Sequence, residues 1–120
     1  MNDAARKSEI ESLRSVLVSA IEAGRFGIGC WAETLEYNPD AGTATIRDHE
    51  ADPPKDYNVT LETVRLGLQR MRDGQVTCVG KPWVHGYHVW ARFMADEGES
   101  DGPDADNIVQ AGLFGEIVYG

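Results

Sequence analysis

The chain has 120 residues, of which 42% are hydrophobic and 26% charged, and its formal net charge is −9 at pH 7. This length and composition predict one folded domain, residues 1–120, and exclude a disordered chain. The 20 acidic residues against 11 basic ones argue against direct binding to nucleic acid, and no apolar run approaches the roughly 18 residues of a membrane span.

An amphipathic helix is predicted over residues 4–23, at the start of the chain. Ile10, Leu13 and Leu17 recur at helical spacing, and charged residues occupy the opposite face. Gly24 follows directly and can adopt the left-handed conformation that often ends a helix. The polar N-terminus has no apolar signal-peptide core, so we expect a cytoplasmic protein.

A β-hairpin is predicted next, from two strands joined by a tight turn. Residues 26–37 have the pattern of a strand, and residues 43–48 would return beside it. Residues 38–42, Asn-Pro-Asp-Ala-Gly, have the composition of a turn. Four residues of the first strand would share one face: Trp31, Glu33, Leu35 and Tyr37.

A second helix is predicted after a polar, proline-containing loop over residues 48–56. Residues 57–59 form a short extended piece, Thr60 suits the N-cap position, and Asp73-Gly74 would end the helix. The segment 75–79 is rich in β-branched residues and predicts a short strand. Apolar residues on one stripe of the helix are Leu61, Val64, Leu68 and Met71.

The last third of the chain combines an ambiguous segment, a linker and a terminal helix. Residues 83–94 fit both the helical and the strand period, and we favour a helix. Residues 96–104 are predicted to be a flexible acidic linker, after which a helix starts near Pro103 or Asp104 and carries apolar residues as far as Ile117. The predicted fold class is α+β: a small antiparallel sheet, a hairpin plus one or two short strands, covered by the N-terminal, central and C-terminal helices.

Motifs for phosphate binding and redox chemistry are weak in this sequence. The glycine-rich turn at residues 24–29 follows a helix, whereas a phosphate cradle has to open one. Cys30 and Cys78 belong to no C-x-x-C pair, which argues against a zinc or redox motif. We expect Cys30 to be a buried free thiol within the first strand.

Metal binding would recruit the histidines of the ambiguous segment. His85 and His88 could share one helical face, but the third ligand, Asp96 or Glu97, would come from the flexible linker. A real site needs several ligands with fixed geometry. The sequence therefore predicts no metal site, no cofactor and no enzymatic activity.

Aromatic and polar residues set in apolar stretches are the candidate binding residues. We expect the segment 90–93, Trp-Ala-Arg-Phe, to form an interface, because aromatic residues and arginine are enriched at interfaces. An inward Glu33 could act as an acid or base, the alternative being a rim position or a pairing with Arg25 or Arg47. The candidate set is Trp31, Glu33, Trp90, Arg92, Phe93, Gln110 and Glu116.

Two segments of the chain resemble a known group of proteins. These are Gly27-Ile28-Gly29-Cys30-Trp31-Ala32-Glu33 and the closing Leu113-Phe114-Gly115-Glu116-Ile117-Val118-Tyr119-Gly120. They resemble a family of short proteins of unassigned function that bacteriophages, prophages and plasmids carry, mainly in actinobacteria. The resemblance implies a mobile-element context, in which small accessory proteins often inhibit host defence by binding.

The leading hypothesis is a non-enzymatic binding protein, a homodimer that sequesters a host protein or a small signalling molecule in the host cell. An alternative is a small ligand-binding domain or enzyme whose site lies between the Trp31–Glu33 strand and the C-terminal helix. A third possibility is an assembly component of a phage. The net acidity is explained by solubility or by mimicry of DNA.

Overall fold

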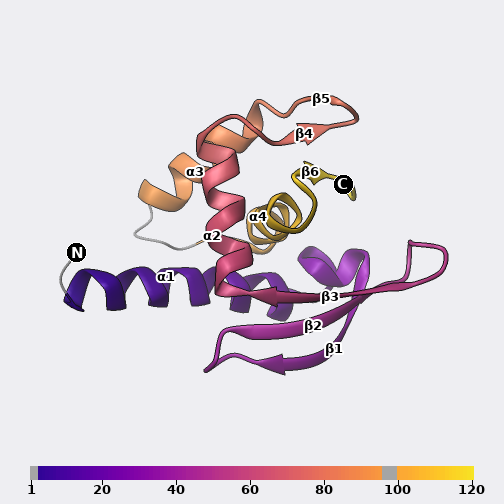
Figure 1. Ribbon diagram of the computed structural model, residues 1–120, viewed down its shortest axis with the longest axis horizontal. Helices are drawn as coiled ribbons and strands as arrows, with labels where there is room; N and C mark the ends of the chain where they lie inside the picture. Colours follow the sequence, from indigo (N-terminus) through magenta and orange to yellow (C-terminus); the bar gives the residue numbers. More distant parts are fainter. Residues whose placement is uncertain (1–2, 96–99) are drawn as a thin grey trace.

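The computed structural model describes residues 3–95 and 100–120. Their fold is α+β, as predicted: helices cover one face of a three-stranded antiparallel sheet, and a second sheet of short strands lies at the other end of the molecule (Figure 1). In chain order, with η for short 3-10 helices, the elements are α1 (Asp3–Glu22), η1 (Gly24–Phe26), η2 (Ile28–Cys30), β1 (Ala32–Asn38), β2 (Thr43–Asp48), β3 (Lys55–Thr60), α2 (Leu61–Arg72), β4 (Thr77–Cys78), β5 (Lys81–Pro82), α3 (His85–Ala95), α4 (Gly102–Phe114) and β6 (Glu116–Ile117).

The helices α1 and α2 begin and end within one residue of their predicted positions. The apolar stripe of α1 places Leu13 and Leu17 in the core. Thr60 caps α2, because the Thr63 N–H donates to Thr60 Oγ1 at 3.4 Å and the Thr60 N–H donates to Thr63 Oγ1 at 3.1 Å. This reciprocal pair satisfies donors that the first turn of a helix leaves free.

The predicted hairpin is confirmed, and a third strand extends it. β1, β2 and β3 pair antiparallel in that order, so the extended segment 57–59 joins the sheet within β3. The turn between β1 and β2 is held by Asn38 Oδ1, which accepts from the Ala41 N–H at 3.1 Å. The face towards the helices buries the apolar residues Ala44, Ile46 and Val59, together with Asp48 at the end of β2.

The first strand begins later than predicted, because residues 24–30 form the two short turns η1 and η2. These turns pack closely against the end of α1. A Cβ atom on Gly27 would lie 2.3 Å from the carbonyl oxygen of Ala20, so a side chain has no room at this position. Gly27 therefore allows the backbones of η1, η2 and α1 to approach closely, and it does not begin a strand.

The residues after these turns do not share one apolar face, contrary to the prediction. Trp31 precedes β1 and is buried, whereas Leu35 is exposed. A bulge between Thr34 and Glu36 shifts the register of β1 against β2 and interrupts the expected alternation. Cys30 is exposed at the end of η2, so the expectation of a buried thiol is wrong.

The segment 83–94 is helical from His85, as we favoured, and these residues form most of α3. The strand expected at residues 75–79 is shorter and corresponds to β4. The linker expected at residues 96–104 is partly replaced by α4, which already begins at Gly102, and residues 96–99 lie outside the described part of the chain.

The terminal helix α4 ends earlier than predicted. At its start, Asp101 Oδ1 accepts from the Asp104 N–H at 2.8 Å. At its end, Gly115 adopts a left-handed conformation with φ of 70°, which stops the helix after Phe114. Ile117 therefore lies in β6, which pairs parallel with β4, and its placement on the helix is wrong.

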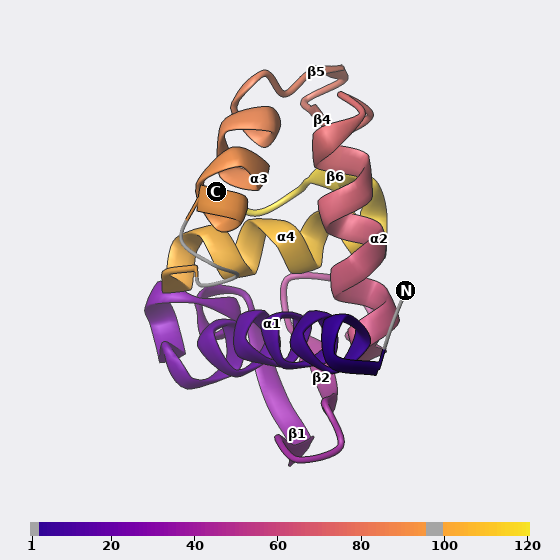
Figure 2. The same cartoon turned by 90° about the vertical axis from the view of Figure 1, so that its left-hand side faces the viewer.

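The helices α4 and α2 cross in close contact, and Figure 2 shows α4 running between α1 and α3. A Cβ atom on Gly67 of α2 would lie 2.0 Å from the carbonyl oxygen of Ile108. A Cβ atom on Gly112 of α4 would lie 2.0 Å from the carbonyl oxygen of Thr63. The backbones touch at both positions, so the crossing depends on two glycines, one from each helix.

The turn between β4 and β5 contains a strained residue. Val79 has a φ of 53° and is 90% exposed, and Gly80 follows with a φ of 74°. A β-branched residue is strained in this conformation, and Asn-Gly is the preferred pair for such turns. We expect Val79→Asn to raise the free energy of unfolding by about 1 kcal/mol, as measured by urea denaturation.

The matched control for this turn is Val84→Asn. Val84 is 71% exposed and lies outside the set of residues with positive φ. This substitution removes a similar apolar surface without relieving backbone strain. Equal effects of the two substitutions would contradict a conformational origin of the gain.

Candidate functional site

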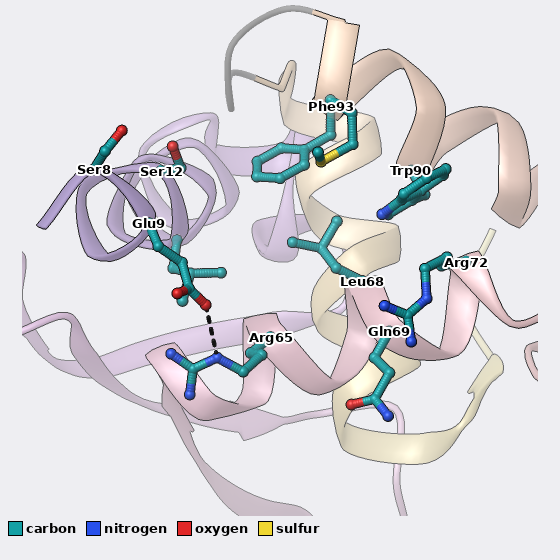
Figure 3. Close-up of a pocket in the computed structure, with 11 residues that line it drawn as sticks. Ser8, Glu9, Ser12, Arg65, Leu68, Gln69, Arg72, Trp90 and Phe93 are labelled. Atoms are coloured by element: carbon teal, nitrogen blue, oxygen red, sulfur yellow. Dashed lines mark hydrogen bonds and ion pairs between the residues drawn. The ribbon is translucent and has the colours of Figure 1, made fainter. Parts of the chain in front are cut away.

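A groove opens between α1, α2 and α3 (Figure 3). Within each helix the lining residues recur at spacings of three or four, so that one face of each helix points into the groove. The groove has a volume of about 760 Å³, which is a typical size for a ligand site. Its lining residues are Ser8, Glu9, Ser12, Leu13, Arg65, Leu68, Gln69, Arg72, Trp90, Phe93 and Met94.

The floor of the groove is apolar and belongs to the protein core. Leu13, Leu68 and Phe93 are 3%, 7% and 7% exposed, respectively, and all three are members of the core cluster. Because core packing fixes these side chains, the floor is present without a bound molecule. The groove is therefore a preformed surface.

One wall of the groove is formed by α3. Trp90 is half-buried, and its ring lies 5.5 Å from the ring of Tyr87. Met94 is 58% exposed. Large apolar side chains left in water beside a groove are typical of binding surfaces, and methionine adapts its shape to different partners.

The rim of the groove is polar and charged along α2. Arg65 pairs with Glu9 of α1 at 3.2 Å, and also with Glu62. Arg72 pairs with Asp73 through two contacts of 2.8 and 3.2 Å. These pairs are exposed, so each contributes little to stability and can be exchanged for contacts to a bound molecule.

Two of the three arginines of α2 lie at the groove, and the third contacts α4. Arg70 reaches α4, where its Nη1 donates to the carbonyl oxygens of Ala111 at 2.7 Å and Gly112 at 3.1 Å. These contacts satisfy carbonyl groups in the last turn of α4. Arg65 and Arg72 lie at the groove, so the three arginines do not form one basic patch.

The predicted interface segment 90–93 is split between two surfaces. Trp90 and Phe93 line the groove. Arg92 lies outside the lining and donates to the carboxylate of Asp104 at 3.1 and 3.0 Å, which links α3 to α4. The aromatic members of the segment are therefore available to a ligand at the groove, whereas Arg92 has a structural contact.

The two predicted glutamates are both exposed. Glu33 does not point inward, and its Oε2 lies 2.8 Å from Nε2 of His49. The exposed position agrees with the rim alternative and not with an inward carboxylate, because β1 exposes most of its residues, and the partner is neither Arg25 nor Arg47. Glu116 lies in β6, on the other sheet.

The other two predicted residues, Trp31 and Gln110, belong to a buried hydrogen-bond network centred on Asp106. Trp31 Nε1 donates to Asp106 Oδ1 at 2.8 Å. Gln110 Nε2 donates to Asp106 Oδ2 at 3.2 Å and to the carbonyl oxygen of Tyr119 at 2.9 Å. Gln110 Oε1 accepts from the N–H groups of Val118 and Tyr119, each at 2.9 Å. The network uses both polar atoms of Gln110, so its role is structural.

Tyr119 connects this network to the three-stranded sheet. Its ring stacks on Trp31 at 4.9 Å, and its hydroxyl donates to Asp48 Oδ2 at 2.6 Å. Asp106 and Asp48 are buried polar residues that were not among the predicted site residues. For Asp106 the sequence held a signal, because a position four residues before Gln110 shares its face of an α-helix.

Burial changes the proton affinity of this network. Burial raises the pKa of Asp106 from 3.8 to about 6, although the hydrogen bonds from Trp31 and Gln110 act in the opposite direction. Between about pH 4 and pH 6, the carboxyl group of Asp106 is thus protonated in the folded state and ionised in the unfolded chain. The stabilisation is complete below about pH 4 and is lost as the pH rises through about 6, with an expected loss of about 3 kcal/mol.

Urea denaturation at several pH values measures this dependence, and Asp106→Asn isolates it. The variant has no carboxyl group to titrate, so the difference in unfolding free energy between wild type and variant should change with pH over the same range. We expect the variant to be less stable than the wild type at every pH. The NH2 group of the new asparagine would face an N–H donor of Trp31 or Gln110, where Asp106 has an acceptor oxygen. A pH-independent difference would contradict the raised pKa.

The described residues contain no group of three or more His, Cys, Asp or Glu side chains that could hold a metal ion. The proposed third ligands of His85 and His88, Asp96 and Glu97, lie outside the described residues. None of the described helices combines the length and apolar character required to cross a bilayer.

Comparison with protein-family models, curated protein sequences and solved structures gives no match to this chain. The resemblance to proteins of mobile elements therefore stays a prediction.

Proposed function

We propose that this chain is a non-enzymatic binding protein of a mobile genetic element, which holds a host protein or a small signalling molecule in the groove between α1, α2 and α3. The observation that carries the proposal is the groove itself. It combines an apolar floor, an aromatic wall and a charged rim, the usual composition of a recognition site. Inhibition of host defence is the most concrete form of this function, and it follows from the sequence resemblance.

The alternative site, between the Trp31–Glu33 strand and the C-terminal helix, has less support. Glu33 and Glu116 are exposed on different sheets, and the polar atoms of Gln110 are engaged within the protein. The groove contains none of these three residues. An enzyme would need such polar groups to converge on one substrate position.

Phage plating on bacterial strains that carry defence systems tests the proposal. We expect the wild-type chain to restore plating and Trp90→Ala to lose this effect, because the aromatic wall of the groove is removed. The matched control is Tyr87→Ala, which removes an exposed aromatic side chain from the same helix outside the groove lining. Circular dichroism and a thermal melt check that both variants are folded.

Two outcomes would count against this function. One is that the wild-type chain neither restores plating nor captures a partner from host lysate. The other is that the Trp90→Ala and Tyr87→Ala variants restore plating equally well. Light scattering after size-exclusion chromatography tests the proposed homodimer, and large assemblies would instead favour a structural component of a phage.

A further inference from the structure

The groove has a shape that a further helix could fill. Three helices each present one face to it, as the helices of a bundle do around a neighbour. On α2 the lining runs from Arg65 to Arg72, seven residues apart, which corresponds to about 10 Å along the helix axis. A partner helix lying along α2 would contact this face over about two turns.

The apolar groups of the groove suit the apolar stripe of an amphipathic helix. Leu13, Leu68 and Phe93 form the floor, and Trp90 with Met94 forms the wall. An amphipathic helix fills such a groove with anchors spaced three, four and seven residues apart. The open side of the groove would leave the polar face of that helix in water.

The charges of the rim point to an acidic partner. The lining holds two arginines and one glutamate, in a chain whose net charge is −9. Glu9 is already paired across one end of the groove with Arg65. Arg72 lies at the other end of the α2 face, and its partner is Asp73, its neighbour in sequence. A carboxylate of a bound helix can replace Asp73 at modest cost, because this pair is exposed.

From these observations we infer that the groove binds an acidic amphipathic helix of a partner protein. The inference rests on the proposed binding function and specifies its partner. Apolar anchors of the helix lie on the floor, and an acidic residue flanking them contacts Arg72, since Arg65 already pairs with Glu9 and Glu62. Arginine holds a carboxylate through two parallel hydrogen bonds, which fixes the register of the helix.

Selection from a displayed library of helical peptides tests the inference without a known partner. The purified whole chain serves as the target, and the library varies every position over about four helical turns. We expect enriched peptides to carry apolar residues at helical spacing, flanked by Glu or Asp. Enrichment of peptides without this period, enrichment of basic peptides, or no enrichment would each overturn the inference.

Charge variants then test the contact to Arg72 with one selected peptide. We expect Arg72→Glu to weaken binding about tenfold and Asp73→Asn to strengthen it, because the competing carboxylate is gone. The control is Arg25→Glu, an equal charge reversal at an exposed arginine outside the groove lining. Equal weakening by Arg72→Glu and Arg25→Glu would show only a general charge effect and would overturn the contact.

The outcomes separate this inference from the proposed function. If Trp90→Ala abolishes the plating effect but the selection gives no helical pattern, the groove binds another kind of ligand and only the helix inference fails. If a dimer dissociates on Arg72→Glu, the occupant is a second copy of this chain and the inference is also wrong. If plating does not depend on the groove, the proposed function fails as well.

Discussion

Gly67→Ala is expected to lower the free energy of unfolding by at least about 3 kcal/mol, because the added methyl group meets backbone and not a side chain. Its Cβ would lie 2.0 Å from the carbonyl oxygen of Ile108, so α2 and α4 have to move apart to accept it. Such a movement disturbs the packing of both helices against the rest of the core. Urea denaturation followed by circular dichroism measures the loss.

Two further glycine variants show whether the close helix crossing is responsible. Gly112→Ala places its Cβ 2.0 Å from the carbonyl oxygen of Thr63, so we expect a comparable loss. Gly74→Ala adds the same methyl group where no other atom lies within 4 Å, at a φ of 69°. That variant should cost only about 1 kcal/mol, from its backbone conformation. Equal losses for Gly67→Ala and Gly74→Ala would contradict a steric origin.

Gln110→Met is expected to lower the free energy of unfolding by about 3 kcal/mol. Methionine has nearly the same length, so the volume of the core changes little. The N–H groups of Val118 and Tyr119 lose their acceptor, and Asp106 loses a donor. Unfolding in urea gives the loss of stability, and the fluorescence of Trp31 should change because Tyr119 no longer stacks firmly on it.

The matched control for this network is Gln69→Met. Gln69 is an exposed glutamine of α2, and it lies outside the buried network. Its replacement should change the free energy of unfolding by less than about 0.5 kcal/mol. If the two glutamine variants were equally stable, the network around Gln110 would not hold the C-terminal segment.

Elements with local sequence signals could be predicted from the sequence. The stripe of α1, the turn at residues 38–42 and the capping Thr60 are each encoded within a few neighbouring residues. The start of the strand expected at residues 26–37 was wrong because Gly27 packs closely against α1, which is a tertiary feature. The extended terminal helix failed because the apolar run continues through Gly115 while the backbone turns there.

The groove could be predicted only in part. The aromatic segment around Trp90 was expected to bind, and Trp90 and Phe93 do line the groove. The residues of α1 and α2 that complete it gave no signal, because they are ordinary polar positions or, for Leu13 and Leu68, members of the apolar stripe of an amphipathic helix. Only the packing of three helices far apart in the sequence brings them to one surface.

The network around Asp106 also has a consequence for biosynthesis. Trp31 bonds a residue 75 positions later, and Asp48 bonds Tyr119, 71 positions later. During translation, the sheet and α1 therefore emerge from the ribosome well before their partners in α4 and residues 118–119. Until then Trp31 lacks its stacking partner, and this nascent half is open to proteases and chaperones. We therefore expect folding to end with a long-range closing step that joins these segments.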